Sequence, residues 1–300
     1  MQHCACGADS TPHPSGHPGH VAFYPGAGKL LQQSGETFIA IKNQKKKLKY
    51  TLTNDRGVSV YYDCMRIIYS DQDIIVVNKP PGLSVHGGAS VVGRTLVDEL
   101  LEKFPEIAGV GEDPVRPGIV HRLDRDTSGV MVVARNQESF FALKDIFQKR
   151  LAEKTYHAIV CGVPKTSEGT INVPIGRMAR DPTKRGVAAG RNIIRGARDA
   201  ITAYRVLKTG KGMALVELRP KTGRMHQLRV HMKALGHPVA CDVKYGGKNV
   251  CCPVTETGAT EPRRQLLHAQ SLSFSYPPGR RNTFEADPPE DFALASQILF

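Results

Sequence analysis

The densest cluster of polar side chains spans residues 121–129, which read His-Arg-Leu-Asp-Arg-Asp-Thr-Ser-Gly. It presents one carboxylate, Asp124, between two arginines, and nearby positive charge favours the ionised, nucleophilic form of an aspartate. A fixed carboxylate can attack an electron-poor carbon or stabilise positive charge on it. The same segment, with Thr127 and Ser128, could equally form a turn held by Asx-type hydrogen bonds. The residue types alone favour neither the catalytic carboxylate nor the structural turn.

Most of the positive charge of the chain lies in one segment. Residues 176–233 contain fifteen basic and three acidic residues, which is +12 of the whole net charge of +13. Ten of the fifteen are arginines, whose forked guanidinium suits phosphate groups. The segment therefore predicts a polyanionic partner, and nucleic acid is the commonest one. A solubilising surface is the alternative. A second run of lysines, between 42 and 49, fits either a solvated strand edge or a further RNA contact.

The elements that must position Asp124 can be predicted from the spacing of apolar residues. Many strands, few helices and consecutive hairpins predict an α+β fold with a mixed, largely antiparallel sheet and flanking helices. The expected strands are Ile74–Val77, Val130–Ala134, Lys154–Gly162, Ile201–Leu207, Met213–Leu218 and, as the last one, Leu267–Ser275. The expected helices are Thr95–Phe104, Gln137–Leu151 and Gly223–Leu235.

Turns and apolar stripes refine these elements. The glycines of Lys208–Gly212 predict a hairpin turn of that length between two strands. Two helices should each bury one stripe of apolar residues at helical spacing. The stripes are Phe140, Leu143, Phe147 and Leu151 in one helix, and Met225, Leu228, Met232 and Leu235 in the other.

The domain organisation follows from composition. Residues 1–35 are rich in Gly, Pro, His and Ser and are interpreted as a flexible leader, residues 36–64 as a small accessory β segment, and residues 65–300 as the main domain. No apolar run approaches the roughly 18 residues that a membrane-spanning helix needs, so no membrane association is expected. The N-terminus also lacks the apolar stretch of a signal peptide.

Seven cysteines occur at irregular spacing, and no CxxC pair is present. An odd number of irregularly spaced cysteines fits a reducing compartment better than a disulfide framework, and the lack of CxxC argues against a structural zinc site. Cys4 and Cys6 could bind adventitious metal together with His3, His13, His17 and His20, but this stretch is interpreted as part of the leader.

The motifs of the main domain closely resemble those of the RluA-type family of RNA pseudouridine synthases. The matching segments occur in family order over about residues 66–277, and chance does not produce so many ordered matches. They are Val77–His86, His121–Val130, Lys154–Gly162, Thr222–His231, Leu235–Pro238 and Leu267–Ala269.

The resemblance implies an isomerase that detaches the uracil of an RNA uridine, turns it over and rejoins it through C5, with neither cofactor nor metal. It assigns the catalytic nucleophile to Asp124, an active-site tyrosine to Tyr156 and the arginine that pairs with the nucleophile to Arg229. It also implies that Arg122 enters the RNA and helps to evict the target nucleotide, because the uridine must leave the stack to be reached. His86, His226 and His268 are expected to be structural or to face the RNA.

The expected partner is RNA, presented as a structured loop with a flippable uridine, and the expected state is a monomer. Ribosomal and transfer RNA both remain open as substrates, and cytoplasm, nucleus and organelle as compartments. A binding module that keeps the fold and lacks catalysis is the alternative function, although all three catalytic positions hold the required residue types. Further substrate contacts are expected from His121, Arg125, Thr127, Arg224 and Gln227.

Overall fold

The computed structural model of the chain forms two compact units, Met1–Asp63 and Cys64–Phe300. It describes the backbone of residues 30–33, 36–42, 48–53 and 59–63, and the complete residues 65–88, 91, 93–188, 194–246, 251–252 and 264–300. The lysines 45–47 and the cysteines Cys4 and Cys6 lie outside the described residues.

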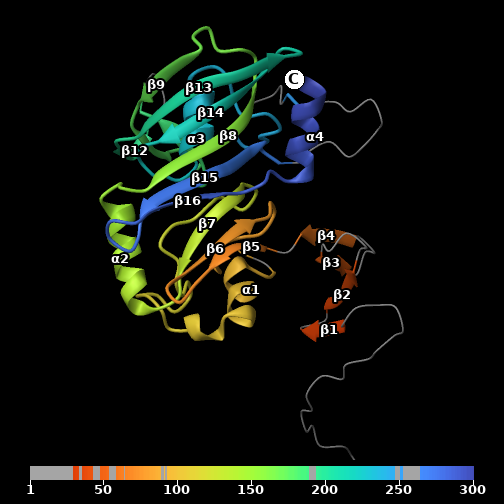
Figure 1. Cartoon of the computed structure of the whole chain (residues 1–300). Coiled ribbons are helices and arrows are strands. Elements are labelled where there is room, and N and C mark those ends of the chain that lie inside the picture. Colours follow the sequence, from red (N-terminus) through yellow and green to blue (C-terminus); the bar gives the residue numbers. More distant parts are fainter. Residues whose placement is uncertain are drawn as a thin grey trace, which may run out of the picture. The chain divides into compact units, whose positions relative to one another are not determined.

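The first unit contains an antiparallel sheet of four described strands in the order β1-β2-β3-β4 (Figure 1). The strands are β1 (Leu30–Gln33), β2 (Glu36–Lys42), β3 (Leu48–Thr53) and β4 (Ser59–Asp63). β1 pairs with β2 and lies inside the segment that the composition assigned to a leader of residues 1–35. The rest of that segment lies outside the described residues.

The second unit is built on a sheet of nine described strands, with the order β5-β6-β7-β15-β8-β14-β13-β9 and β16 paired to β15. All pairs are antiparallel except β7 and β15, which are parallel. The expected α+β fold with a mixed, largely antiparallel sheet is thus confirmed (Figure 1). The strands are β5 (Arg66–Ser70), β6 (Ile74–Lys79), β7 (Ser128–Ala134), β8 (Glu153–Cys161), β9 (Glu168–Asn172), β13 (Ile201–Gly210), β14 (Met213–Pro220), β15 (Leu267–Ser275) and β16 (Arg281–Glu285).

The helices cover this sheet from both faces. Alternate residues of a strand point to opposite faces, and Ala158 of β8 packs in one apolar cluster with Leu228 of α3, whereas Ile159 packs in another with Phe292 of α4. A third cluster joins α1 and α2 to strands β6 and β7. The helices are α1 (Leu96–Lys103), the short 3-10 helix η1 (Pro105–Ile107), α2 (Gln137–Gln148), α3 (Gln227–Ala234) and α4 (Glu290–Leu299). No helix among the described residues is long and apolar enough to cross a membrane.

A small three-stranded sheet, in the order β11-β10-β12, is inserted between β9 and β13. Its strands are β10 (Ile175–Met178), β11 (Arg185–Val187) and β12 (Ile194–Arg198). It carries part of the basic segment found in the sequence, including the exposed side chains of Arg177, Arg195 and Arg198. The sequence analysis did not predict this sheet, because its short strands lack a strict alternation of apolar residues.

Several predicted boundaries were wrong for local reasons. The helix expected from Gly223 begins at Gln227, because the residues before it form a turn in which His226 has φ of 57°, a left-handed conformation. Met225 is therefore outside the helix and half exposed. α2 ends at Gln148, so Leu151 does not continue its buried stripe and is 61% exposed. The predicted last strand is followed by β16 and α4.

The expected hairpin turn at Lys208–Gly212 is also too long. Strand β13 continues to Gly210, with a register shift between Val206 and Lys208, and pairs Gly210 with Met213. The turn itself consists of Lys211 and Gly212, which both have positive φ. Two residues with positive φ match the twist of antiparallel strands, which explains why so short a turn suffices here.

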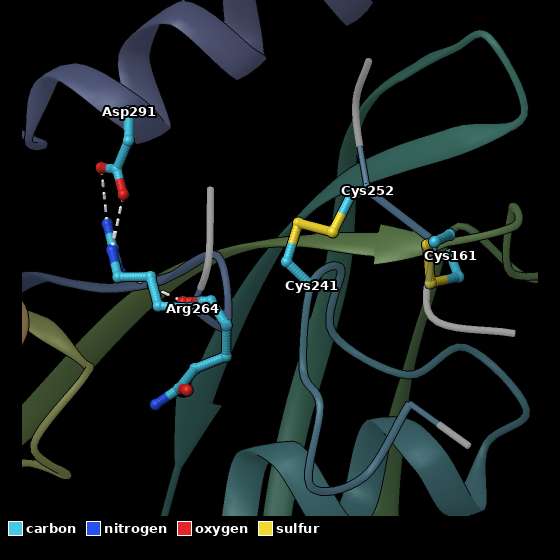
Figure 2. Close-up of a disulfide and its surroundings, with 7 residues drawn as sticks. Cys161, Cys241, Cys252, Arg264 and Asp291 are labelled. Carbon is cyan, nitrogen blue, oxygen red and sulfur yellow. Dashed lines mark hydrogen bonds and ion pairs between the residues drawn. A yellow bond between two sulfur atoms is a disulfide. The ribbon is translucent and has the colours of Figure 1, made fainter. Parts of the chain in front are cut away.

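The cysteines also differ from expectation. Cys161 is paired with Cys251, and Cys241 is paired with Cys252, so four of the seven cysteines form disulfides (Figure 2). The inference from irregular spacing was wrong because pairing depends on proximity in space, and these pairs are 90 and 11 residues apart in sequence. The two disulfides connect residues 251–252 to Cys161 in strand β8 and to Cys241 after helix α3. The backbone N–H of Cys241 also donates to the carbonyl of Cys251.

Candidate active site

Asp124 lies in the loop directly before β7. The loop turns through a backbone hydrogen bond of 3.1 Å from the N–H of Thr127 to the carbonyl of Asp124, and Leu123 anchors it in the core. Gly129 lets the loop enter the sheet, because a Cβ there would lie 2.2 Å from the carbonyl oxygen of Ala269 on the neighbouring strand β15. The turn is thus closed by the backbone, which leaves the Asp124 carboxylate free for another partner.

A buried lysine is hydrogen-bonded to the backbone of the Asp124 loop. Lys79, at the end of β6, has no exposed area, and its Nζ donates to the carbonyls of Pro80, Leu83 and Arg125 at 2.7, 2.9 and 2.8 Å. Burial lowers the pKa of Lys79 to about 7, with a further contribution from the charge of a nearby arginine. The three carbonyl acceptors match the three hydrogens of an ammonium group, so this side chain ties the Asp124 loop to the turn that follows β6.

Arg264 is also hydrogen-bonded to the backbone of this loop. Its Nη1 donates to the carbonyl of Asp126 at 3.0 Å, while Nε and Nη2 form a bidentate pair with Asp291 of α4 at 2.6 and 2.8 Å (Figure 2). The guanidinium is largely buried. Arg264 therefore fixes the loop relative to the C-terminal helix.

Arg229 of α3 connects Asp124 to a second, buried carboxylate. Its Nη1 lies 3.0 Å from Oδ2 of Asp124, and its Nε and Nη2 donate to Asp242 at 2.7 and 2.9 Å. The side chain of Asp242 has no exposed area, whereas that of Asp124 is 23% exposed. Burial lowers the pKa of Arg229, but the hydrogen bonds and charges of Asp242 and Asp124 outweigh it and raise the pKa above its usual value. Arg229 is thus a permanent cation that holds one oxygen of Asp124.

Asp242 is itself held by the backbone. Its Oδ1 accepts the N–H groups of Lys244 and Tyr245 at 3.0 Å each. These two bonds fix the orientation of the Asp242 side chain toward Arg229. The sequence analysis missed Asp242, because an isolated aspartate after a cysteine gives no recognisable pattern.

His226 and Tyr245 also face the site, although the sequence analysis did not include them among the catalytic residues. Nε2 of His226 lies 3.9 Å from Oδ1 of Asp124, and its Nδ1 lies 2.6 Å from the hydroxyl of Tyr245. The Tyr245 ring packs under the guanidinium of Arg229, 5.0 Å from it. The site around Asp124 thus contains one further carboxylate, one arginine, one histidine and one tyrosine.

Tyr156 comes from β8, where it pairs with Leu218 of β14 and Ala269 of β15. It packs against the apolar clusters on both halves of the sheet. Burial, followed by the negative charge of Asp124, raises the pKa of Tyr156 well above its usual value. Among the described residues its hydroxyl has no hydrogen-bond partner. The raised pKa favours a neutral phenol near Asp124, which suits a contact surface better than a base.

Three expected substrate contacts have structural roles instead. His121 accepts the N–H of Val132 at 3.0 Å and stacks on Phe147. Thr127 is buried and its hydroxyl accepts from the side chain of Gln265. Gln227 is buried at the start of α3, where it bonds the side chains of Thr222 and Thr202 and the carbonyl of Ile201. At least one polar atom of each of these side chains is thus hydrogen-bonded inside the protein.

The other expected contacts stay closer to the surface. Arg122 is exposed and its Nη1 lies 3.0 Å from Nε2 of His86. Arg125 is exposed and pairs with Asp126. Arg224 donates to the carbonyl of Asp199 at 3.0 Å. Arg122 and Arg125 flank Asp124 in the loop, so they remain able to meet a ligand there.

His268, next to this loop, predicts how stability depends on pH. It is fully buried, with Nδ1 at 3.0 Å from Oγ of Ser128 and Nε2 at 2.8 Å from the carbonyl of Ala286. Burial lowers the pKa of His268 from 6.5 to about 4. Because the folded state then binds fewer protons than the unfolded one, stability falls as pH drops from about 6.5 to 4, by up to about 1.4 kcal/mol per pH unit.

Urea unfolding of the full chain at pH 7, 6 and 5 measures this dependence. We expect His268→Gln to reduce the pH slope without abolishing it. The amide can still donate to the Ala286 carbonyl but does not titrate, whereas burial also lowers the pKa of His121 and His226. A variant that keeps the full slope of the wild type would show that other groups cause it.

Chemically, the site offers a fixed carboxylate with one oxygen held by a permanent cation. Within the part of the chain that the structure describes, no group of three or more His, Cys, Asp or Glu side chains is placed to hold a metal ion. The residues of the site itself are suited to covalent or electrostatic catalysis at an electron-poor carbon.

Comparison with known proteins gives this site a context. Residues 73–234, which include Asp124, Tyr156 and Arg229, match the family model described as RNA pseudouridylate synthase. The chain is 40% identical over 240 residues to ribosomal large subunit pseudouridine synthase D of Pseudomonas aeruginosa. The match covers 78% of this chain and 72% of that protein.

Two further matches extend the comparison. An uncharacterized RNA pseudouridine synthase of Synechocystis is 40% identical over 214 residues, which is 70% of this chain and 61% of that protein, so the chain spans less than two thirds of that relative. The solved structure of human RNA pseudouridylate synthase domain containing 1 is 26% identical, with a TM-score of 0.62, and the match covers 78% of this chain and 87% of that one.

Proposed function

This chain belongs to the RNA pseudouridylate synthase family, whose members are isomerases, and from this premise we propose that Asp124 drives the isomerisation of a uridine in RNA to pseudouridine. In this reaction the N1–C1′ bond breaks, the uracil turns over and a C5–C1′ bond forms. The C5 proton is lost and N1 gains one, so that atoms and electrons balance without any oxidant or reductant.

The proposal depends on how the Asp124 carboxylate is held and how much of it is exposed. Arg229 holds its Oδ2 at 3.0 Å, while 23% of the side chain remains exposed. When the N1–C1′ bond breaks, the ribose becomes electron-poor, and a fixed, ionised carboxylate lowers the energy of that transition state. Because the guanidinium is already anchored on Asp242, little reorganisation is needed at the moment of reaction.

Tyr156 and Arg122 complete the proposed site. Tyr156 supplies an aromatic surface for the detached uracil, and its raised pKa keeps it neutral until the substrate binds. Arg122 stacks in the space that the flipped uridine leaves, and its exposure permits this. Extrusion of the nucleotide costs a few kcal/mol, which contacts with the RNA must supply.

The small sheet β10–β12 is the proposed RNA-binding surface. Arg177, Arg195 and Arg198 are exposed there, and none of them forms an ion pair with another described residue. We expect the triple reversal to glutamate to weaken RNA binding about tenfold or more near 0.1 M salt. The slope of log affinity against log salt should flatten by up to about 0.7 for each lost phosphate contact on a single strand. Filter binding over a salt series measures both effects.

A matched control changes the same amount of charge elsewhere. Arg66, Lys149 and Arg281 are exposed but already paired with acidic residues. Reversal of these three should leave the salt slope unchanged. Equal effects from the two triple variants would mean that only the net charge of the protein matters, and the sheet would not be a binding surface.

Tritium release tests the proposed reaction directly. RNA labelled with tritium at C5 of uridine should lose its label to water when incubated with the full chain, because C5 forms the new bond. RNA labelled at C6 is the control and should keep its label. Binding of RNA without tritium release from ribosomal, transfer or total RNA would show a binding protein instead of an enzyme.

Ribosomal RNA is the proposed substrate, since curated relatives from several bacteria are named as ribosomal large subunit enzymes. The uridine would lie in a structured loop from which it can flip, and the enzyme would act as a monomer. Mapping of pseudouridine in ribosomal and transfer RNA, with and without the gene, identifies the substrate. Loss of a site in transfer RNA alone would overturn the ribosomal assignment.

A further inference from the structure

The tautomer of His226 can be deduced from its hydrogen-bond partners. The Tyr245 oxygen accepts the backbone N–H of Arg185 at 3.0 Å and lies 2.6 Å from Nδ1 of His226. A tyrosine hydroxyl has a single hydrogen, and Nδ1 of His226 is its only acceptor among the described residues. The oxygen could accept a second hydrogen bond, but the hydrogen of this buried hydroxyl would then have no acceptor among the described residues. The favoured arrangement therefore has Nδ1 accepting this hydrogen and the proton of a neutral imidazole on Nε2.

The imidazole is also kept neutral by its surroundings. Burial lowers the pKa of His226 to about 4, and the nearby cations Arg229, Lys244 and Arg185 act in the same direction, against the opposing effect of Asp124. At neutral pH the side chain thus has one N–H, on Nε2, which faces Asp124.

The two oxygens of Asp124 have different surroundings as a result. Oδ2 accepts a hydrogen bond from Arg229 at 3.0 Å, whereas Oδ1 faces Nε2 of His226 at 3.9 Å. A separation of 3.9 Å is too long for a hydrogen bond. Oδ1 therefore does not accept a hydrogen bond from His226, whose Nε2 lies about 1 Å beyond hydrogen-bond distance.

The backbone around His226 supports a positioning role. His226 has φ of 57° at the position before α3, a conformation that costs a non-glycine residue energy and that occurs often at functional sites. Its carbonyl accepts the N–H of Val230 at 3.0 Å, which starts the helix. The side chain is thus directed by a rigid helix start and by Tyr245.

We propose that Tyr245 fixes His226 as the Nε2–H tautomer and that His226 is a positioning residue, which donates this N–H to Oδ1 of Asp124 once RNA is bound. The contact orients Oδ1 as the reacting oxygen and stabilises the carboxylate when it is released at the end of the reaction. Asp124 enters and leaves the cycle ionised, and His226 keeps its proton throughout. This inference rests on the proposed function for its kinetic part only.

Nitrogen-15 NMR of histidine-labelled full chain tests the tautomer without any activity assay. We expect His226 to give the signals of the Nε2–H form at pH 7, and Tyr245→Phe to give a mixture of tautomers. An Nδ1–H form in the wild type would overturn the proposal, whether or not the protein makes pseudouridine. Failure of the proposed function is distinguishable, since it appears as absent tritium release with the NMR result intact.

Kinetics test the donor itself. His226→Asn removes the N–H at the Nε2 position, and we expect kcat to fall about 10- to 100-fold, the size of one charge-assisted hydrogen bond in the transition state, with KM for RNA within about threefold. His226→Gln places an amide N–H near Nε2 and should restore most of that loss. Equal kcat values for the two variants would overturn the positioning role. His157→Asn, on β8, is the control and should keep the wild-type kcat.

Discussion

Asp124→Asn is expected to lower pseudouridine formation by about 10⁴-fold or more, while RNA affinity stays within about threefold of the wild type. The amide has nearly the same shape as the carboxylate, and its oxygen can still accept the hydrogen bond from Arg229. The loop is held by backbone bonds and by Lys79 and Arg264, none of which depends on the Asp124 side chain. What the variant loses is the negative charge and the nucleophile that the proposed mechanism assigns to Asp124.

Single-turnover tritium release and filter binding on the same RNA measure the two quantities. Asp126→Asn is the matched control, because Asp126 lies two residues further in the same loop and its side chain pairs with the exposed Arg125. We expect this control to keep its activity within about twofold. If Asp124→Asn released tritium at the rate of the control, Asp124 would have no place in the mechanism.

The sequence motifs were enough to predict that Asp124 and Arg229 belong to the site. Asp124 and Arg229 were expected as a pair, and they lie 3.0 Å apart although 105 residues separate them in sequence. The apolar runs around β7 and β15 were also sufficient, since buried strands of β-branched and small residues have few alternatives. These elements bring the loop of Asp124 next to α3.

Other parts of the site depend on tertiary structure and have no local pattern. Asp242 is an isolated acid whose role arises because the chain after α3 returns to the guanidinium of Arg229. His226 and Tyr245 contribute to the site because their side chains contact each other, and their spacing along the chain does not predict that contact. His121, Thr127 and Gln227 show the converse, since polar residues inside a motif turned out to hold the fold. The disulfides follow the same rule, because proximity decides which cysteines pair.

Arg229→Lys is expected to reduce both stability and activity, because one side chain serves two carboxylates. The guanidinium binds Asp242 with two nitrogens and Asp124 with the third. A lysine has a single ammonium group and cannot reproduce this fork. Asp242, which has no exposed area, would lose most of its charge compensation. We expect a loss of about 3 kcal/mol in the free energy of unfolding and a fall in kcat of about 100-fold or more.

A second substitution separates the two effects. In Arg229→Lys/Asp242→Asn the buried charge is gone, and the asparagine oxygen can still accept the N–H groups of Lys244 and Tyr245. Stability should therefore recover by about 2 kcal/mol, since the uncompensated charge is the main cost. Activity should not recover, because the lysine lacks the anchor that holds it against Asp124. Urea unfolding and tritium release on the three proteins give both values. If the single variant unfolded at the wild-type urea concentration, the Arg229–Asp242 pair would not be what fixes this site, and the rigid placement of Asp124 would need another cause.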